Sequence, residues 1–177
     1  MNVELVVHVD DHDRVLGVVD RRTATRHGWL HRISTSFCRD EDGRFLVHRR
    51  ADGLARFPGY YEVPFGGAVH AGESYQAAAA RELTEELGVH APIRFVLKFL
   101  CRGALGSYWL GIHDAVLIGE IDPNPREVGW AGWMTEPELR DAIERHCFVP
   151  DGQEALRRYL AAQRPARTIL DRDARSG

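Results

Sequence analysis

The sequence contains few cysteines, and their positions suggest neither a metal site nor a disulfide framework. The chain has 3 cysteines, Cys38, Cys101 and Cys147, which lie far apart and form no CxxC pair. An odd number of distant cysteines argues against a small disulfide-rich secreted domain and against a cysteine-ligated zinc site. A reducing, cytoplasmic compartment is therefore the expected location.

Long apolar runs and an excess of one charge are also missing from the sequence. The longest apolar stretch, around 115–118, has the length of a strand, whereas a bilayer-spanning helix needs about 20 apolar residues. The first residues lack the basic and apolar regions of a signal peptide. The 23 Lys and Arg nearly balance the 26 Asp and Glu, which leaves a net charge of −3. We therefore expect neither a nucleic acid polymer nor a membrane as a partner.

The chain does have the size and composition of one globular domain. Its 177 residues are 44% hydrophobic and 28% charged, without an internal repeat or a low-complexity block. The last residues are rich in arginine and in small or polar residues, which is typical of a weakly held terminus. We predict a single domain over 1–165 and a C-terminal tail over 166–177.

Strand patterns dominate the first half of the sequence. Apolar and polar residues alternate over 3–9, and a short apolar run covers 15–19. Two β-prone runs, at 33–38 and 45–48, flank an Asp-Gly pair, which predicts a hairpin. The later β-prone segments are 93–100 and 108–120.

Helix signals are clearest in the second half. The segment 74–87 is rich in alanine, has no internal Gly or Pro, and is followed by Gly88. Thr135 and Glu138 form a capping-box pattern that predicts a helix to about residue 145. Asp151 is expected to cap a last helix that reaches about residue 163. A mixed sheet, one central helix and a C-terminal pair of helices together predict an α+β fold.

Three glutamates of the central helix form the most unusual feature of the sequence. At roughly 100° per residue, Glu82, Glu85 and Glu86 fall on one narrow face. Their repulsion costs about 0.2–0.5 kcal/mol per like pair, and the C-terminal end of a helix also disfavours negative charge. Glutamates on a helix are often only solvated, but this crowding is relieved if a cation binds. Hard oxygen ligands suit Mg²⁺ or Mn²⁺, with substrate phosphates completing the coordination.

The residues before and within this helix complement the three carboxylates. Gly66 and Gly67 allow the backbone to approach a ligand closely. Arg81 lies one turn before Glu85 and can orient that carboxylate by a charge-assisted hydrogen bond. Glu73 stands at the start of the helix, from where its carboxylate can bind back into the loop.

The segment 67–89 resembles the signature of the Nudix hydrolases at every defined position. The pattern is Gly, five residues, Glu, seven residues, Arg-Glu, an aliphatic residue, any residue, Glu-Glu, any residue, Gly and an aliphatic residue. The resemblance implies an α/β/α sandwich with a mixed sheet, in which the signature forms a loop–helix–loop. It also implies that water cleaves the P–O–P bond of a small diphosphate substrate with the help of Mg²⁺ or Mn²⁺.

The resemblance also implies roles for individual residues. Glu82, Glu85 and Glu86 correspond to metal ligands, together with the carbonyl of Gly67, and one of the carboxylates would accept the proton of the attacking water. Two further residues, Arg81 and Glu73, correspond to orienting residues of the catalytic centre.

Outside the signature, four segments resemble the Nudix subgroup related to isopentenyl diphosphate isomerase. They are 29–32, 47–50, 57–59 and 127–133. The isomerases carry Cys-Gly-His just ahead of the signature helix, where this chain has Gly66, Gly67 and Ala68. Because both reactive groups are missing and the signature glutamates are intact, we expect a hydrolase. An isomerase-like enzyme and a non-catalytic nucleotide-binding module remain the alternatives, although crowded glutamates serve no purpose in a module that only binds.

Four residues outside the signature are weaker candidates. Glu127, in a proline-rich loop, could bind a metal, act as the general base or be an ordinary loop carboxylate. Arg49 and Arg50 are adjacent in a predicted strand and face opposite sides, so at most one contacts a substrate phosphate. His31 could line the substrate pocket or be structural. A nucleoside di- or triphosphate or a nucleotide sugar is the expected substrate, and a homodimer is compatible with the sequence.

Overall fold

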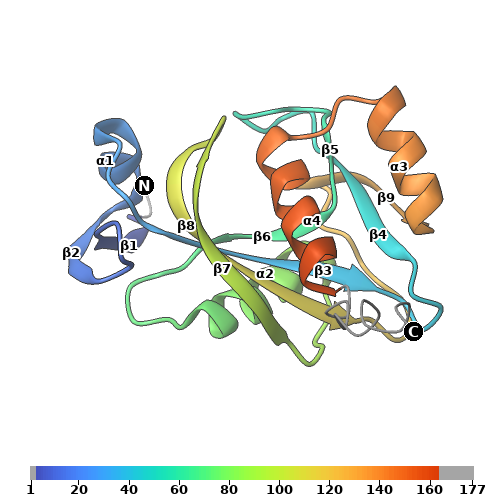
Figure 1. Ribbon diagram of the computed structural model, residues 1–177, viewed down its shortest axis with the longest axis horizontal. Helices are drawn as coiled ribbons and strands as arrows, with labels where there is room; N and C mark the ends of the chain where they lie inside the picture. The colour runs from blue at the N-terminus through green and yellow to red at the C-terminus, as the bar shows by residue number, and fades with distance from the viewer. Residues whose placement is uncertain (1–2, 164–177) are drawn as a thin grey trace, which may run out of the picture.

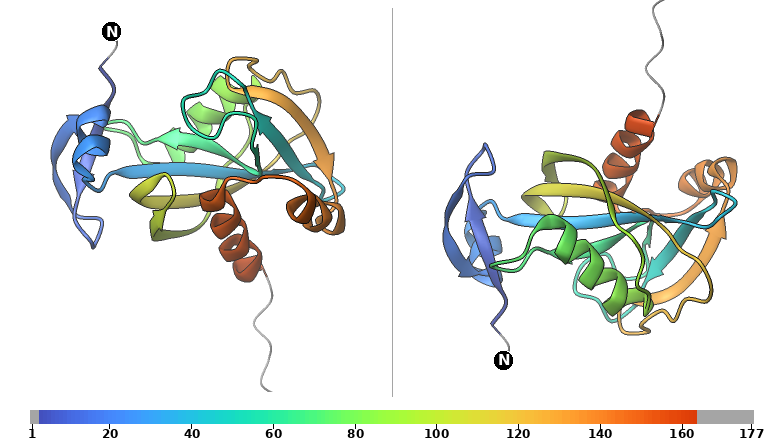
Figure 2. Two further views of the ribbon diagram at one scale, coloured as in Figure 1. Left: turned by 90° about the horizontal axis from the view of Figure 1, so that it is seen from above. Right: turned by 90° about the horizontal axis from the view of Figure 1, so that it is seen from below.

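The computed structural model describes residues 3–163 as a mixed β-sheet with helices on both faces (Figure 2). The elements follow one another in the order β1 (Leu5–Val9), β2 (Val15–Asp20), α1 (Arg21–His27), β3 (Arg32–Arg39), β4 (Phe45–Arg50), β5 (Tyr61–Glu62), β6 (Pro64–Ala68), α2 (Tyr75–Leu87), β7 (Arg94–Gly103), β8 (Gly106–Val116), β9 (Val128–Met134), α3 (Glu136–Arg145) and α4 (Pro150–Gln163) (Figure 1). The predicted α+β class and α/β/α layering are confirmed. The domain boundary at 165 and the tail over 166–177 lie outside the described residues.

The main sheet has seven strands, and the neighbouring strands β3 and β4 separate along most of their length. Its path runs β5-β4-β3-β8-β7, while β6 pairs with β3 and β9 pairs with β4. The β3–β8 pair is parallel and the other pairs are antiparallel. The predicted hairpin joins β3 to β4, whose register consists of the pair Arg39↔Phe45. Beyond this pair, β3 continues beside β6 and β4 beside β9, so the two strands diverge toward the side where the polar residues of the signature lie.

Two apolar cores hold the three layers together. One lies between the sheet and the helices α3 and α4, and the other lies between the sheet and α2. Full burial of a large apolar side chain stabilises the fold by about 1.5–3 kcal/mol, so these cores fix the position of α2 against the sheet. The largest fully buried members are Phe37, Phe45, Ile112, Leu139 and Tyr159 on the first side and Leu46, Phe65, Leu83 and Leu87 on the second.

The caps of the helices agree with the sequence except in α4. The Ser74 hydroxyl accepts a hydrogen bond at the start of α2, and Gly88 ends that helix at φ 67°. The predicted capping box of Thr135 and Glu138 is present in α3. The expectation that Asp151 caps α4 is wrong. The helix begins at Pro150, and the buried Asp151 carboxylate instead accepts hydrogen bonds from the turn between β7 and β8.

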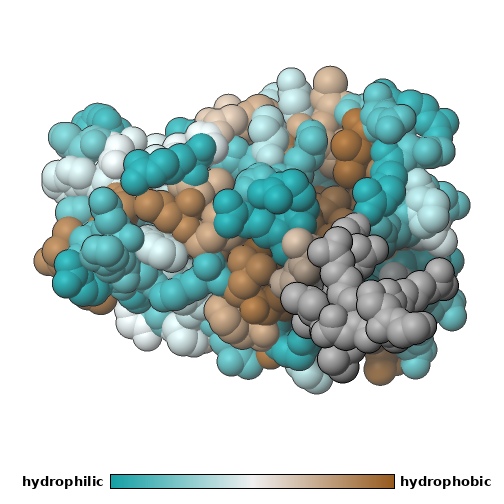
Figure 3. All heavy atoms as spheres, viewed as in Figure 1, coloured by the Kyte–Doolittle hydropathy of each residue, from teal (hydrophilic) through white to brown (hydrophobic). Residues whose placement is uncertain are grey.

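Residues 3–30 form a small unit at one end of the molecule (Figure 2). The β1–β2 hairpin is a separate two-stranded sheet, and α1 follows it directly. The buried Asp13 binds Arg32 at 2.6 Å and also bonds with Lys98, which ties the hairpin to the main sheet. The alternation expected for the first strand is only partly correct, because Val6 is buried and Leu5 is exposed. Apolar side chains are visible on the outer surface of this end (Figure 3).

Candidate active site

A cleft between α2, the main sheet and the N-terminal unit contains most of the predicted site residues. Its acidic end, of about 390 Å³, is lined by the signature carboxylates together with Arg81 and Glu127. A larger cavity of about 660 Å³ continues from it between β8, α1 and the start of α4. The residues that line both parts are Glu4, Arg21, His48, Arg50, Gly66, Gly67 and Glu86.

Two glycines allow β6 to pass very close to its neighbours at the acidic end. A Cβ atom on Gly67 would lie 2.5 Å from Oε1 of Glu82, and one on Gly66 would lie 2.1 Å from the carbonyl oxygen of Ser34. Neither position can therefore hold a side chain without moving the backbone or the carboxylate. The close approach keeps Glu82 and Glu86 almost fully buried, at 8% exposure each, whereas the Glu85 side chain is half exposed.

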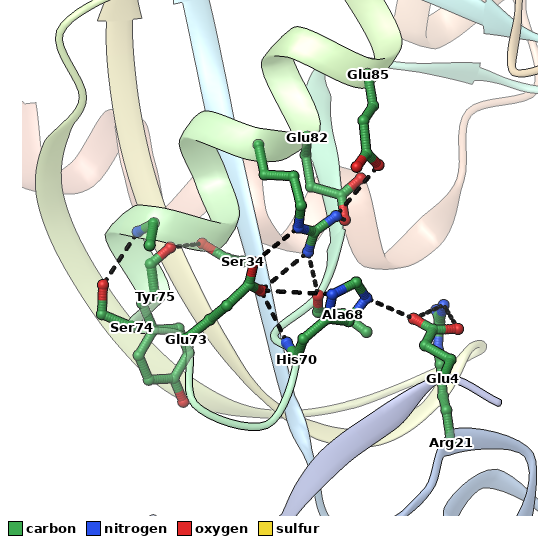
Figure 4. Close-up of polar contacts among 12 residues, drawn as sticks. Glu4, Arg21, Ser34, Ala68, His70, Glu73, Ser74, Tyr75, Glu82 and Glu85 are labelled. Carbon is green, nitrogen blue, oxygen red and sulfur yellow. Dashed lines mark hydrogen bonds and ion pairs between the residues drawn. The ribbon is translucent and has the colours of Figure 1, made fainter. Parts of the chain in front are cut away.

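The guanidinium of Arg81 is the centre of a polar network, toward which the side chains of Glu73, Glu82 and Glu85 converge (Figure 4). Its Nε donates to Glu73 at 2.8 Å, and its Nη1 donates to Glu82 at 2.7 Å and to Glu85 at 3.2 Å. Its Nη2 donates to the carbonyl of Ala68 at 2.9 Å. The sequence suggested an interaction of Arg81 with Glu85 alone, but the structure brings three carboxylates and the β6 backbone together on this one side chain.

Glu73 closes the loop ahead of the helix. Its Oε2 accepts a hydrogen bond from the backbone N–H of His70 at 2.9 Å, in agreement with the expectation that it binds back into the loop. The hydrogen bond from Arg81 lowers the pKa of Glu73, with a smaller contribution from the His70 amide. Glu73 is therefore a charged partner that fixes Arg81, which in turn fixes the start of the signature helix against β6.

At the acidic end of the cleft, the acidic side chains outnumber the arginines. Burial raises the pKa of Glu86 well above its usual value, and the nearby carboxylates of Glu82, Glu127 and Glu62 raise it further. The pKa of Glu82 is also raised by burial, despite its bond to Arg81. Buried carboxylates that repel one another favour binding of a cation.

The donor set fits a hard divalent cation in its chemistry. Carboxylate oxygens are the ligands that Mg²⁺ and Mn²⁺ prefer, and Glu82, Glu85 and Glu86 come from neighbouring turns of one helix. Among residues 3–163, no three acidic, His or Cys side chains are arranged as a closed metal site. The reason is visible in the hydrogen bonds, because Glu82 and Glu85 are both directed to Arg81. A metal ion at this site would therefore compete with Arg81 for two of its ligands.

The other predicted residues occupy different parts of the cleft. Glu127 lines the acidic end, and Arg50 lines both ends and donates to Glu62 at 2.9 Å. Arg49 is not among the residues that line the cleft and pairs with the exposed Asp52 at 2.6 Å. The two adjacent arginines therefore face opposite sides of the strand, as expected from the alternation of strand residues. His31 lines the larger cavity and is 7% exposed.

The structure also adds residues that the sequence did not indicate. His48 lines both ends of the cleft, is 4% exposed and packs against Phe65 with the two rings tilted. Its Nδ1 has no hydrogen-bond partner within the described part of the chain, and burial lowers its pKa to about 3. Glu62, Tyr108 and Asp151 line the larger cavity. A lone His or Asp inside a strand or helix carries no spacing signal, so these residues could be found only in three dimensions.

The family model described as the NUDIX domain matches residues 29–159, which is most of the chain. The chain belongs to the Nudix hydrolase family. An uncharacterised Nudix hydrolase of Streptomyces coelicolor is 39% identical over 161 residues, covering 89% of each chain. The solved structure of a Deinococcus radiodurans protein has a TM-score of 0.77 and 27% identity, and the match covers 88% of this chain and 99% of that one. The Nudix fold implied by the signature is therefore confirmed.

Two further relatives of this Nudix protein come from the isoprenoid branch of the family. An isopentenyl-diphosphate Δ-isomerase of Nocardia farcinica is 37% identical, over 93% of this chain and 97% of that protein. A prenyl-diphosphate phosphatase of Methanosarcina mazei is 30% identical, over 79% and 84% respectively. The resemblance to the isomerase-related subgroup is thus confirmed, and it includes both an isomerase and a phosphatase. None of the described helices is long and apolar enough to cross a bilayer.

Proposed function

We propose that this Nudix protein is a Mg²⁺- or Mn²⁺-dependent hydrolase that cleaves the P–O–P bond of a small diphosphate substrate. The observation that carries this proposal is the buried Glu86, which lies among Glu82, Glu62 and Glu127 at the acidic end of the cleft with its pKa raised well above normal. Such a cluster is unfavourable in the free protein and becomes favourable when a divalent cation and a diphosphate bind together.

Different residues have different roles in the proposed hydrolysis. A cation held by Glu82, Glu85, Glu86 and the Gly67 carbonyl would shield the diphosphate charge and lower the pKa of water. A carboxylate, Glu86 or Glu127, accepts the proton of the attacking water. Arg81 and Glu73 hold the signature helix against β6.

We propose that Arg50, which lines both ends of the cleft, binds a phosphate oxygen of the substrate. His31 lines the larger cavity, so we propose that it contacts the part of the substrate beyond the diphosphate.

The local packing supports a hydrolase rather than an isomerase. The position that holds Cys in the isomerases is Gly66, where a Cβ would lie 2.1 Å from a backbone oxygen. The position that holds their His is Ala68, which is 1% exposed and packs against Val6 and Ala24 of the N-terminal unit. Neither isomerase residue fits this backbone without rearrangement.

Two substrate classes are candidates for binding in the larger cavity. Nucleoside di- or triphosphates and nucleotide sugars are the expectation from the family resemblance. A prenyl diphosphate is the second candidate, because aliphatic side chains line much of the cavity and because one relative is a prenyl-diphosphate phosphatase. The aliphatic and proline residues of the lining are Ile33, Ala55, Pro64, Leu105, Leu110 and Ala155.

The remaining expectations from the sequence are also proposals. We propose that the enzyme acts in the cytoplasm, with one catalytic domain over 1–165 and a tail over 166–177. We also propose a homodimer, supported by the exposed Val15, Leu16 and Val18 of β2, which are 61%, 60% and 55% exposed. Small apolar side chains gathered on one strand at a sheet edge are a common basis for association.

A screen for the products of P–O–P cleavage, which are phosphate, diphosphate or phosphate monoesters, and for isomerised substrate tests the proposed function. Nucleoside di- and triphosphates, nucleotide sugars and prenyl diphosphates are incubated with the enzyme in Mg²⁺, in Mn²⁺ and in excess chelator. We expect hydrolysis of at least one class, restored by metal after chelation. Binding of nucleotides without any hydrolysis would support the non-catalytic module instead, and conversion of isopentenyl diphosphate to its isomer would support the isomerase.

A further inference from the structure

Asp151 forms an unusual connection between helix α4 and the turn that joins β7 to β8. Its carboxylate is 4% exposed and accepts hydrogen bonds from the backbone N–H of Ala104 at 2.7 Å and of Leu105 at 3.2 Å. The hydroxyl of Tyr108 donates to the same carboxylate at 2.6 Å. A buried carboxylate with three donors is well compensated, so the turn is held firmly to the first turn of α4.

The same turn is held from its other side by the loop between β4 and β5. The Nη1 of Arg56 donates to the carbonyl oxygen of Leu105 at 2.6 Å. The Arg56 carbonyl in turn accepts hydrogen bonds from Arg50 at 3.2 and 3.3 Å, and Arg50 binds Glu62 at 2.9 Å. A continuous chain of polar contacts therefore runs from the cleft, through Arg50 and Arg56, to Leu105 and Asp151.

The β7–β8 hairpin and the start of α4 pack closely against their neighbours. A Cβ on Gly103 would lie 2.3 Å from Oδ1 of Asp151, so the hairpin approaches the carboxylate as nearly as a backbone can. A Cβ on Gly152 would lie 3.2 Å from Cγ of Glu62, so the start of α4 also packs tightly, though less closely, against β5. The turn, α4 and β5 are thus fixed relative to one another around one side of the larger cavity.

The connected residues also line the cavity itself. Arg56, Leu105, Tyr108 and Asp151 all line its wall, as the arginines of α1 also do. The Leu105 side chain is partly buried and packs on the main core, so its position follows that of the turn. Burial and the bond to Asp151 raise the pKa of Tyr108, so its hydroxyl stays protonated and remains a donor.

We propose that Asp151 and Arg56 are positioning residues that select the substrate: they hold the β7–β8 turn so that Leu105 contacts an apolar group attached to the diphosphate. The inference rests on the proposed function, because it assumes that the diphosphate occupies the acidic end. It goes beyond that function by assigning substrate preference to two residues that touch neither the metal face nor the scissile bond. Neither residue forms part of the signature.

The test compares two non-hydrolysable probes, the methylene-bridged analogues of geranyl diphosphate and of methyl diphosphate. Their dissociation constants are measured by calorimetry in Mg²⁺ for the parent, Asp151→Asn and Arg56→Gln. The matched control is Glu154→Gln, an equivalent change one turn further along α4, where Glu154 pairs with Arg157 and Arg158 instead. Arg56 is exposed, so its variant reports on the turn even if Asp151→Asn does not fold.

We expect the parent to prefer the geranyl probe, and each test variant to reduce that preference about tenfold, since each loses at least one buried or charge-assisted hydrogen bond. With hydrolysable substrates the loss should appear in KM more than in kcat, and Glu154→Gln should keep the parental preference. Equal weakening of both probes, or no preference in the parent, would overturn the inference. Normal probe discrimination without any hydrolysis would contradict the proposed function while leaving the inference intact.

Discussion

The charged form of the Glu86 carboxylate is disfavoured in the free protein. Its carboxylate is almost completely buried, and three neighbouring carboxylates raise its pKa further. Glu73 is the opposite case, since Arg81 and a backbone amide stabilise its charge and lower its pKa. The two ends of the signature therefore differ in purpose. Glu73 helps to hold the structure together, whereas we propose that a bound cation stabilises the charge of Glu86.

Replacing Glu86 by Gln should separate activity from stability. Metal-dependent turnover should fall by about 10²–10⁴-fold, the range typical of losing acid–base assistance. The melting temperature should stay level or rise, because a buried charge and its repulsion are removed. Parallel measurements on Glu127→Gln identify the base. A larger loss of turnover than in Glu86→Gln, with unchanged metal affinity, would place it at Glu127. Parental turnover in both variants would mean that the catalytic centre lies elsewhere.

His48 should make the stability of the protein depend on pH. Burial lowers its folded pKa to about 3 from the usual 6.5. As the pH falls below about 6.5, the unfolded chain binds a proton that the folded chain does not, so the free energy of unfolding should decrease until about pH 3. His48→Phe should flatten this decrease without abolishing it, because burial also lowers the pKa of His31 and His113.

Denaturant titrations at several pH values between 3 and 7 measure this effect. The exposed His12, in the turn between β1 and β2, provides the control His12→Phe, which should keep the parental profile. If His48→Phe and the parent lost stability with the same slope, His48 would not be the neutral buried residue described here.

Among the elements, the helix α2 was the most predictable from sequence. An alanine-rich segment without Gly or Pro, a serine before it and a glycine after it define its ends by local chemistry, and the structure places them at Tyr75 and Leu87. The capping box of α3 and the Asp-Gly hairpin are equally local signals. Elements defined by their immediate neighbours in the chain can be recognised without knowing the fold.

Gly88→Ala tests the local reason for the end of α2. Gly88 adopts φ 67°, and a Cβ there would also lie 3.3 Å from the Cβ of Asp122. An alanine in the left-handed region costs about 1–2 kcal/mol, so the free energy of unfolding should fall by about that amount. Substrate KM should change little, since Gly88 is not among the residues that line the cleft. An unchanged stability would mean that the helix end adapts.

Other elements were missed because their signals are not local. The helix α1 has no apolar period, and only Asp20 before it and Gly28 after it mark its ends. The strand β6 contains Gly66 and Gly67, and glycine is unfavourable inside a strand. Asp151 has the sequence context of a helix cap, but its partners are contributed by a hairpin more than 40 positions earlier.

On the scale of the whole molecule, the cleft is assembled from parts that are distant in the sequence. The three carboxylates of the signature and Arg81 lie together because one helix carries them. The remainder of the cleft requires the parallel pairing of β3 with β8 and the docking of the N-terminal unit. Nothing in a single sequence specifies such long-range pairings, so the larger cavity and its lining became visible only in the folded chain.

The central claim is that the acidic end of the cleft binds a divalent cation through the signature glutamates. The most direct measurement is a titration of the metal-free protein with Mn²⁺, in which electron paramagnetic resonance detects the free ion. We expect weak binding by the protein alone and tighter binding with a methylene-bridged diphosphate present. Glu86→Gln should weaken the binding at least tenfold, because a hard ligand and a negative charge are lost together, and the surface change Glu154→Gln should have no effect. Absence of Mn²⁺ binding, or equal affinity in the parent and Glu86→Gln, would contradict the account.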